Sequence, residues 1–395
     1  MHIRFIRFCL VALALGSSSA LAGTMQPVAS FGANPGALSM YEYAPASLPV
    51  GRPLVVVMHG CTQLASAMEV AGWNTLADEH GFAVLYPEQQ TGNNPVRCFN
   101  WAGEYGDTAN LERAKGENQS IISMIDTAIA AHGSDPQRVY VVGFSAGAAF
   151  VSVMLATWPE RFAAGAIMSG LPYRCATTVN GAFSCQSPGV TKSAAQWGEL
   201  VRGASSFGGP WPRVQIWQGA TDTTVVPANQ AELVKQWTNV HETDDTADTT
   251  ETIGKATRTE YRAGSELVVE TYTIATMGHA VVTGGDGCPP AIGAYFSDQG
   301  ICSTLRAADF FELRGAGSGS GSGSGSGNGS GSGSDDPDPA NAMPGCSLDA
   351  SGGGAGFASF LVIALACIRR RRRRPMAPSH DPGWFLLAGS NTWPR

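Results

Sequence analysis

Residues 139–150 read VYVVGFSAGAAF, and this stretch decides the fold class. Its first four residues are apolar and mostly β-branched, which favours a buried strand, whereas its last residues favour a helix. Between them lies Ser145 in a Gly-x-Ser-x-Gly pattern, whose small neighbours allow a sharp, strained turn that exposes the serine hydroxyl. The stretch therefore predicts a nucleophile elbow. The alternative is a glycine-rich turn in which Ser145 only caps the following helix.

Strands and helices are predicted to alternate along the chain. Apolar runs predict strands at residues 54–58, 82–86 (ended by Pro87), 139–142, 163–169, 214–217 and 267–274. Longer stretches predict helices at residues 64–80, 120–131, 146–158 and 228–241. This order indicates an α/β fold with a mostly parallel sheet covered by helices on both faces. Reactive groups of such sheets collect in loops at the carboxyl ends of the strands, where Ser145 lies.

Composition divides the chain into five parts. Residues 1–22 have a basic start, an apolar stretch and a final Ala-Leu-Ala, which is typical of a secretory signal and its cleavage site. Residues 23–313 are long enough for one α/β domain. Residues 314–344 are rich in Gly and Ser and then in acid and proline, which predicts a flexible tether. Residues 345–374 are predicted to be a sorting signal, and residues 375–395 have no assignable pattern.

The predicted sorting signal joins an apolar run at residues 355–368 to six arginines at residues 369–374. The run is shorter than the roughly 20 residues that cross a bilayer comfortably, and the arginines would fix its orientation. A small motif, either around Cys346 or at residues 351–354, precedes it. The segment resembles the tripartite C-terminal signals of rhombosortase and myxosortase substrates, which implies a sorting protease as partner. An ordinary single-pass anchor is the alternative.

These terminal segments predict that the protein is secreted and is either extracellular or attached to the cell surface. Membrane contact is expected only through the C-terminal segment. The formal net charge of −7 at pH 7 argues against a nucleic-acid partner, because a polyanion would be repelled.

Six of the nine cysteines lie in residues 23–313. An even number of cysteines in an oxidising compartment favours disulfides over a metal site. Six cysteines allow fifteen pairings; proximity along the chain favours Cys175 with Cys185 and Cys288 with Cys302, which leaves Cys61 with Cys98. The sequence has no Cys-x-x-Cys or His-Glu-x-x-His spacing, so we predict no catalytic metal and no cofactor.

A serine hydroxyl becomes a nucleophile when a base takes its proton and a third group orients the base. In the α/β-hydrolase arrangement the chain order is Ser, then Asp or Glu, then His. His241 and His279 follow Ser145 within residues 23–313. His279 lies in a loop after the last apolar strand and is the expected base, whereas His241 ends a helix beside acids, as a charge partner of the helix C-terminus does.

The expected acid is Asp222, which follows the strand at residues 214–217. Asp244, Asp245 and Asp248 lie in a polar loop and are expected to be solvated. The alternative for Asp222 is a charge at the N-terminus of the next helix.

The negatively charged oxygen of an acyl-transfer intermediate needs backbone N–H donors that already point at it. One donor is expected to be the N–H of Ala146, directly after the nucleophile. The other is expected to be the N–H of Cys61, in the loop after an early strand, and a bridge from Cys61 to Cys98 would stiffen that loop. The alternative is that Cys61 is itself a nucleophile.

Eight motifs in this order resemble the secreted polyhydroxybutyrate depolymerase and feruloyl esterase family of α/β-hydrolases. They are HGCTQ (59–63), FAVLYPEQ (82–89), CFNW (98–101), VYVVGFSAGA (139–148), AAGA (163–166), SGLPY (169–173), GATDTTV (219–225) and MGHA (277–280). The resemblance spans residues 41–311 and implies a catalytic triad of Ser145, Asp222 and His279 with Cys61 in the oxyanion loop.

Three positions depart from the pattern of that family. Gly147-Ala148 replaces the usual Gly-Gly, Val281 stands where an aromatic residue is common, and Gln218 stands where a histidine is common. We expect these positions to affect the lining of the pocket more than the triad, which leaves the substrate open.

The sequence therefore predicts a secreted serine esterase that works through an acyl-enzyme on short hydroxyalkanoate esters or oligomers of the polyhydroxybutyrate type. Feruloyl or acetyl esters of plant polysaccharide are the first alternative, since no separate polymer-binding domain is visible. An inert surface-binding protein on a hydrolase scaffold and a serine peptidase with the same triad are the others.

Overall fold

A computed structural model describes residues 24–103, 108–285, 288 and 293–314 of the chain. Contacts divide the chain into residues 1–323 and 324–395, and all described residues belong to the first unit. The predicted signal, the sorting signal, the tail and all of the tether except Arg314 lie outside the described residues. In the described part, no helix is long and apolar enough to span a membrane.

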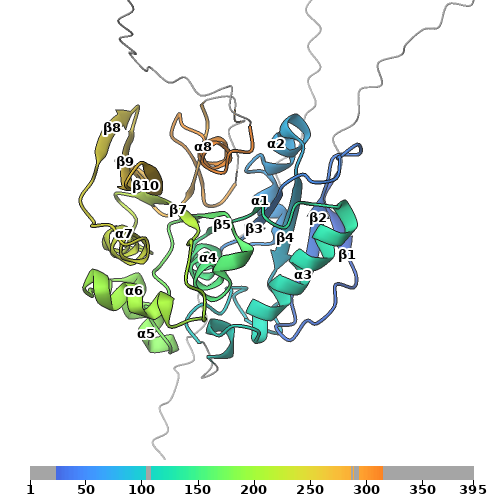
Figure 1. Cartoon of the computed structure of the whole chain (residues 1–395), viewed down its shortest axis with the longest axis horizontal. Helices are drawn as coiled ribbons and strands as arrows, with labels where there is room; N and C mark the ends of the chain where they lie inside the picture. Colours follow the sequence, from blue (N-terminus) through green and yellow to red (C-terminus); the bar gives the residue numbers. More distant parts are fainter. Residues whose placement is uncertain (1–23, 104–107, 286–287, 289–292, 315–395) are drawn as a thin grey trace, which may run out of the picture. The chain divides into compact units, whose positions relative to one another are not determined.

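One ten-stranded sheet organises the described residues, in the order β1-β2-β4-β3-β5-β6-β7-β10-β9-β8 (Figure 1). The central strands from β4 to β10 are parallel, and β2, β1, β9 and β8 are added antiparallel at the two edges. The strands are β1 (Gln26–Val28), β2 (Ser39–Tyr43), β3 (Leu54–Met58), β4 (Ala83–Glu88), β5 (Val139–Phe144), β6 (Ala164–Met168), β7 (Arg213–Gly219), β8 (Thr249–Ile253), β9 (Ala256–Ala263) and β10 (Glu266–Ile274). A small parallel pair, β11 (Val281–Thr283) with β12 (Phe296–Asp298), lies outside this sheet.

Helices cover both faces of the sheet, as the alternation along the chain predicts (Figure 1). They are α1 (Ala65–Glu69), α2 (Trp73–His80), α3 (Gly116–His132), α4 (Ala146–Thr157), α5 (Val179–Gln186), α6 (Ala194–Arg202), α7 (Ala228–Val240) and α8 (Ser303–Phe310), with 3₁₀ turns η2 (Ala109–Leu111) and η3 (Pro159–Arg161).

The two hydrophobic cores follow from the alternation of side chains along the central strands. In β3, every residue is buried, because a strand covered on both faces buries both sets of side chains. Leu54, Val56 and Met58 belong to the core under α3, α4 and α7. Val55 and Val57 belong to the core under α1, α2 and α8. The prediction of a mostly parallel α/β fold is confirmed.

Several predicted bounds shift, since α3 begins at Gly116 and not at residue 120, and two predictions are wrong for a physical reason. Residues 64–80 form two helices instead of one, because Gly72 between them adopts a left-handed conformation with φ 95°. Pro87 does not end its strand: β4 continues to Glu88, with Pro87 opposite Met40 of β2. The pairing of β4 with β3 ends at Leu85, opposite Val56. Beyond that residue β4 pairs only with β2, so the missing N–H of Pro87 can cost a ladder hydrogen bond on one side only.

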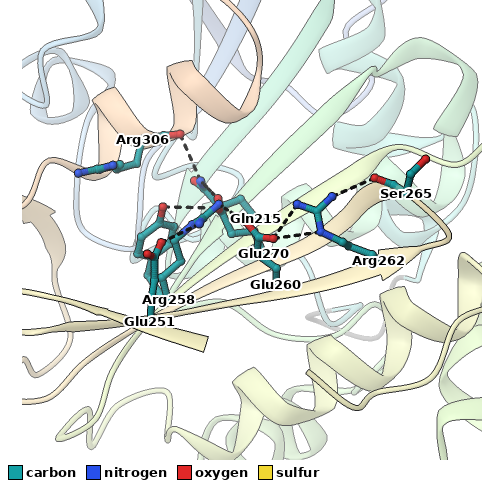
Figure 2. A network of polar contacts seen from close by, with 9 residues as sticks. Gln215, Glu251, Arg258, Glu260, Arg262, Ser265, Glu270 and Arg306 are labelled. Atoms are coloured by element: carbon teal, nitrogen blue, oxygen red, sulfur yellow. Dashed lines mark hydrogen bonds and ion pairs between the residues drawn. The ribbon is translucent and has the colours of Figure 1, made fainter. Parts of the chain in front are cut away.

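A network of ion pairs joins β8, β9 and β10 near one edge of the sheet (Figure 2). Arg258 contacts Glu251 at 2.8 Å, Glu260 at 2.5 Å and Glu270 at 2.5 Å. Glu270 also accepts a hydrogen bond from Gln215 at 2.6 Å. Burial raises the pKa of Glu270, and the guanidinium of Arg258 opposes that rise. The network compensates a carboxyl group that is only 3% exposed.

Candidate active site

Ser145 occupies a strained turn between β5 and α4. Its φ of 55° and ψ of −120° lie outside the regions that residues with a side chain normally adopt. Its N–H donates to the carbonyl of Met168 at 2.9 Å, which ties the turn to the end of β6. Its side chain makes no capping hydrogen bond to α4. The interpretation of Ser145 as a simple helix cap is therefore wrong.

The two glycines of the pattern are required by close packing of backbone. A Cβ atom on Gly143 would lie 2.5 Å from the carbonyl carbon and oxygen of Gly147. A Cβ atom on Gly147 would lie 2.5 Å from the carbonyl oxygen of His59 and 2.7 Å from that of Met58. The elbow thus packs directly against the end of β3 and the residue that follows it.

His279 lies in the loop after β10 and is within hydrogen-bond distance of Ser145. Its Nε2 is 2.9 Å from Ser145 Oγ, and its Nδ1 is 2.7 Å from Asp222 Oδ2. With Nδ1–H donating to the carboxylate, Nε2 is left as an acceptor for the serine proton. The side chain of His279 is 10% exposed, and its ring packs 4.8 Å from that of Phe144.

Asp222 lies in the loop after β7, six residues before the start of α7 at Ala228. Its Oδ1 accepts two backbone hydrogen bonds, from Thr224 and Val225, each at 2.9 Å. Burial alone would raise the pKa of Asp222, but the hydrogen bonds from His279 and from these two N–H groups outweigh it and lower the pKa. Asp222 is therefore ionised at neutral pH and hydrogen-bonded to His279, and it is not a charge on the first turn of α7.

Gln218, at the end of β7, contacts the acid directly. Its Nε2 lies 3.3 Å from Asp222 Oδ2 and donates to the carbonyl of Val225 at 2.9 Å. The expectation that the departures from the family pattern concern the pocket lining is wrong for this residue. It is also wrong for Ala148 and Val281, whose side chains are fully buried in the two hydrophobic cores.

The loop after β3 lies beside the elbow and is held by several bonds. Gly60 N–H donates to Gln63 Oε1 at 2.8 Å, and Thr62 N–H donates to the carbonyl of Val96 at 2.7 Å. Cys61 is bonded to Cys98, with Cα atoms 4.2 Å apart. A disulfide sulfur cannot serve as a thiolate, so a nucleophilic Cys61 is excluded in this state. The roles of the N–H groups of Cys61 and Ala146 as oxyanion donors stay predictions.

The other two disulfides join the cysteines that proximity favours, Cys175 with Cys185 and Cys288 with Cys302. Within the described residues, no group of three or more His, Cys, Asp or Glu side chains could hold a metal ion. His241 caps the end of α7, and its Nε2 lies 3.0 Å from the carbonyl oxygen of Pro212 instead of pairing with the neighbouring acids.

One aromatic side chain beside His279, that of Tyr295, could not be predicted from the sequence. Tyr295, 43% exposed, lies 6.3 Å from the ring of His279 and 6.0 Å from that of Phe144. It borders a hollow of about 380 Å³, whose lining includes Thr62, Leu64 and Val70 from the segment after the Cys61 loop. No motif marks Tyr295, because it reaches the site through the pairing of β12 with β11.

Comparison with known proteins places these features in a family. Residues 38–262 match the family described as esterase PHB depolymerase. A poly(3-hydroxyalkanoate) depolymerase C from Paucimonas lemoignei is 47% identical over 77% of this chain and 73% of its own length. An acetylxylan esterase from Coprinopsis cinerea is 34% identical over 67% of this chain and 71% of its own. A feruloyl esterase B from Neurospora crassa is 33% identical over 69% of this chain and 94% of its own.

Among solved structures, an acetyl xylan esterase from Aspergillus awamori is similar to this chain with a TM-score of 0.63 and 27% sequence identity. The match covers 74% of this chain and 100% of that structure. The similarity therefore extends over a complete esterase fold.

Proposed function

Because this chain belongs to the esterase PHB depolymerase family, whose relatives are carboxylic ester hydrolases, we propose that it hydrolyses esters with Ser145 as nucleophile, His279 as base and Asp222 as the group that orients the base. The observation that carries this proposal is the continuous hydrogen-bonded series from Ser145 Oγ through the ring of His279 to Asp222.

In the first half of the reaction, Ser145 Oγ attacks the ester carbonyl carbon while His279 Nε2 takes the hydroxyl proton. The carbonyl oxygen becomes negatively charged and is stabilised by the N–H groups of Cys61 and Ala146. His279 then gives the proton to the leaving alcohol, and the acyl group stays on Ser145. In the second half, water attacks the acyl-enzyme by the same route and releases the acid.

We propose short hydroxyalkanoate esters or their oligomers as substrates. The support is the 47% identity to a protein named as a poly(3-hydroxyalkanoate) depolymerase, well above that to the named acetylxylan and feruloyl esterases. Acetyl or feruloyl esters are the second candidate, supported by the similarity to the acetyl xylan esterase structure. An inert binding protein would need no hydrogen-bonded nucleophile and base.

We also propose that the enzyme is exported and then held at the cell surface. The support is the signal-like sequence of residues 1–22, the Gly/Ser-rich residues 314–344 and the apolar-arginine segment of residues 345–374. In this scheme a sorting protease acts on that last segment. A mature protein with an intact C-terminus, recovered in the culture medium, would contradict the sorting step.

The test of the reaction and its substrate is a side-by-side assay. Wild-type protein and Ser145→Ala are given p-nitrophenyl butyrate, hydroxybutyrate oligomers, polyhydroxybutyrate granules, acetylated xylan and methyl ferulate. The proposal expects turnover of the butyrate ester and the oligomers by the wild type and essentially none by the variant. Preference for acetylated xylan or ferulate would select the second candidate, and retained activity in Ser145→Ala would refute the nucleophile. A fluorophosphonate probe that failed to label the wild type would indicate the inert protein.

A further inference from the structure

Glu117 is a buried carboxyl group that the proposed mechanism leaves without a role. It is the second residue of α3 and has no exposed surface. Its Oε1 accepts hydrogen bonds from Gln89 Nε2 at 2.6 Å, Asn93 Nδ2 at 2.9 Å and Asn100 Nδ2 at 2.5 Å. Its Oε2 accepts a hydrogen bond from the N–H of Asn100 at 2.8 Å. One side chain thus binds both ends and the middle of the segment at residues 89–100.

This segment is in turn attached to the loop after β3. Three links make the attachment: a hydrogen bond from Gln89 N–H to His59 Nε2 at 3.0 Å, a hydrogen bond from Thr62 N–H to the carbonyl of Val96 at 2.7 Å, and the disulfide between Cys98 and Cys61. Two further bonds stiffen the segment itself, since Asn94 Oδ1 accepts from the N–H groups of Val96 at 3.1 Å and Cys98 at 3.2 Å.

We propose that Glu117 is a positioning residue, which fixes the Cys61 loop against the nucleophile elbow through the segment at residues 89–100. The proposal rests on the proposed function, in which the N–H of Cys61 binds the oxyanion. A Cβ atom on Gly147 would lie 2.5 Å from the carbonyl oxygen of His59, so loop and elbow are in backbone contact. A small shift of the loop therefore changes the distance between the two oxyanion donors, on which catalysis depends steeply.

The charge of Glu117 is set by its own surroundings. Burial raises its pKa to about 7, and its hydrogen bonds limit that rise. Of the charged groups nearby, Arg97 lies 3.9 Å from Glu88, and Glu112 pairs with Lys115 at 2.5 Å. Residues 32–38, which pack against Glu117 at Gly36, carry no charge.

His59 is the remaining titratable group on the loop, and burial lowers its pKa to about 4, so it is neutral at neutral pH. Within the described residues, Glu117 forms no ion pair. Its four hydrogen bonds are therefore the direct contacts through which its ionisation acts on the segment at residues 89–100.

Protonation of Glu117 would weaken this arrangement. All four of its hydrogen bonds come from N–H donors. A protonated carboxyl group carries an O–H that points at these donors, so at least one of the four hydrogen bonds is lost. Activity should then need the loss of a proton from Glu117 in addition to the free base on which the proposed mechanism depends. The acid side of a plot of log kcat against pH should be steeper than a slope of one.

The test is Glu117→Gln, with kcat and KM for p-nitrophenyl butyrate measured across pH. Glutamine keeps the three side-chain bonds to Oε1 but presents an amide NH₂ to the N–H of Asn100. We expect kcat to fall by roughly 10- to 100-fold with KM within about twofold, and the acid slope to fall to one. Glu112→Gln, a similar change near the start of the same helix but at the surface, is the matched control and should match the wild type in kcat, KM and slope.

Asn93→Ala is the second variant, should Glu117→Gln fail to fold. It removes one of the four donors and keeps the carboxyl group, so kcat should fall by about 3- to 10-fold. Wild-type kcat in Glu117→Gln, or a lower kcat with the wild-type acid slope, would overturn the proposal; for Asn93→Ala, wild-type kcat would do so. Failure of the proposed function is a different result, because the wild type itself would then show no hydrolysis that depends on Ser145.

Discussion

Asp222→Asn should abolish catalysis by moving the ring proton of His279 from Nδ1 to Nε2. The two backbone N–H groups of Thr224 and Val225 donate to Oδ1 of Asp222, each at 2.9 Å. An asparagine at this position must place its amide oxygen there, which turns its NH₂ group toward His279 Nδ1. Nδ1 then has to accept a hydrogen bond, so Nε2 carries the proton and cannot take one from Ser145.

The expected loss in kcat is about 10⁴-fold, or about 5 kcal/mol of transition-state stabilisation, because the wrong tautomer removes the base while leaving its position unchanged. The new NH₂ group also faces Gln218 Nε2, which lies 3.3 Å from Oδ2 in the wild type. This donor–donor contact can only add to the loss.

The assay is hydrolysis of p-nitrophenyl butyrate near neutral pH, with circular dichroism to verify folding. Asp244→Asn is the matched control, since Asp244 is exposed and its Oδ1 accepts one local hydrogen bond from Thr246. The control should match the wild type. A folded Asp222→Asn enzyme that retained kcat within tenfold of the wild type would refute the assignment of Asp222.

The remaining predictions concern the elbow, the charged network and pH. Gly147→Ala should destabilise the fold by about 1–3 kcal/mol in urea unfolding and lower kcat, because its Cβ would meet two backbone carbonyl oxygens at 2.5 and 2.7 Å. Gly92→Ala is the control: a Cβ there has nothing within 4 Å, so neither urea stability nor turnover should change. Arg258→Met should lower the free energy of unfolding in urea by about 3–5 kcal/mol, because it leaves the carboxylate of Glu270 buried without a partner charge. Adding Glu270→Gln should restore most of that stability. An unaltered urea midpoint in Arg258→Met would show that this ion pair does not stabilise the fold. The pKa of Glu117 rises from 4.5 to about 7 on folding, so the folded state holds that proton more tightly than the unfolded state. As the pH rises between these values, the free energy of unfolding should therefore fall by about 3 kcal/mol more in the wild type than in Glu117→Gln. Parallel curves of stability against pH for the two proteins would refute this.

The parts of the site that follow strands could be predicted from the sequence. Ser145, Asp222 and His279 each come after an apolar run, and the carboxyl ends of parallel strands meet at one edge of a sheet. Chain order then left few choices of base. The disulfide of Cys61 with Cys98 could be predicted only as the pair left over by the other two, and only the structure puts it beside the elbow.

Edge strands were harder to predict because their side chains lack a hydrophobic pattern. β8 is exposed at four of its five positions and β9 mixes threonine with charged residues, so neither gives the signal of a buried strand. The break at Gly72 was missed because a glycine inside an apolar pattern does not reveal its φ angle.

Polar positions that depend on distant contacts could not be predicted at all. Glu117 binds groups 17 to 28 residues earlier in the chain, and nothing in its local sequence marks it as buried. Gln218 was recognised as a departure from the family pattern, but its contact with Asp222 follows from the turn after β7. Such contacts arise from tertiary structure and not from periodicity.

The most direct test of Ser145 as the nucleophile is to trap the acyl-enzyme. Wild-type protein is mixed with p-nitrophenyl butyrate, quenched in acid within the first turnover, digested and analysed by mass spectrometry. The proposed mechanism predicts a butyryl group on the peptide that contains Ser145, and none on the same peptide of Ser145→Ala. A butyryl group on another residue of the wild type, or rapid turnover of ester by Ser145→Ala, would contradict it.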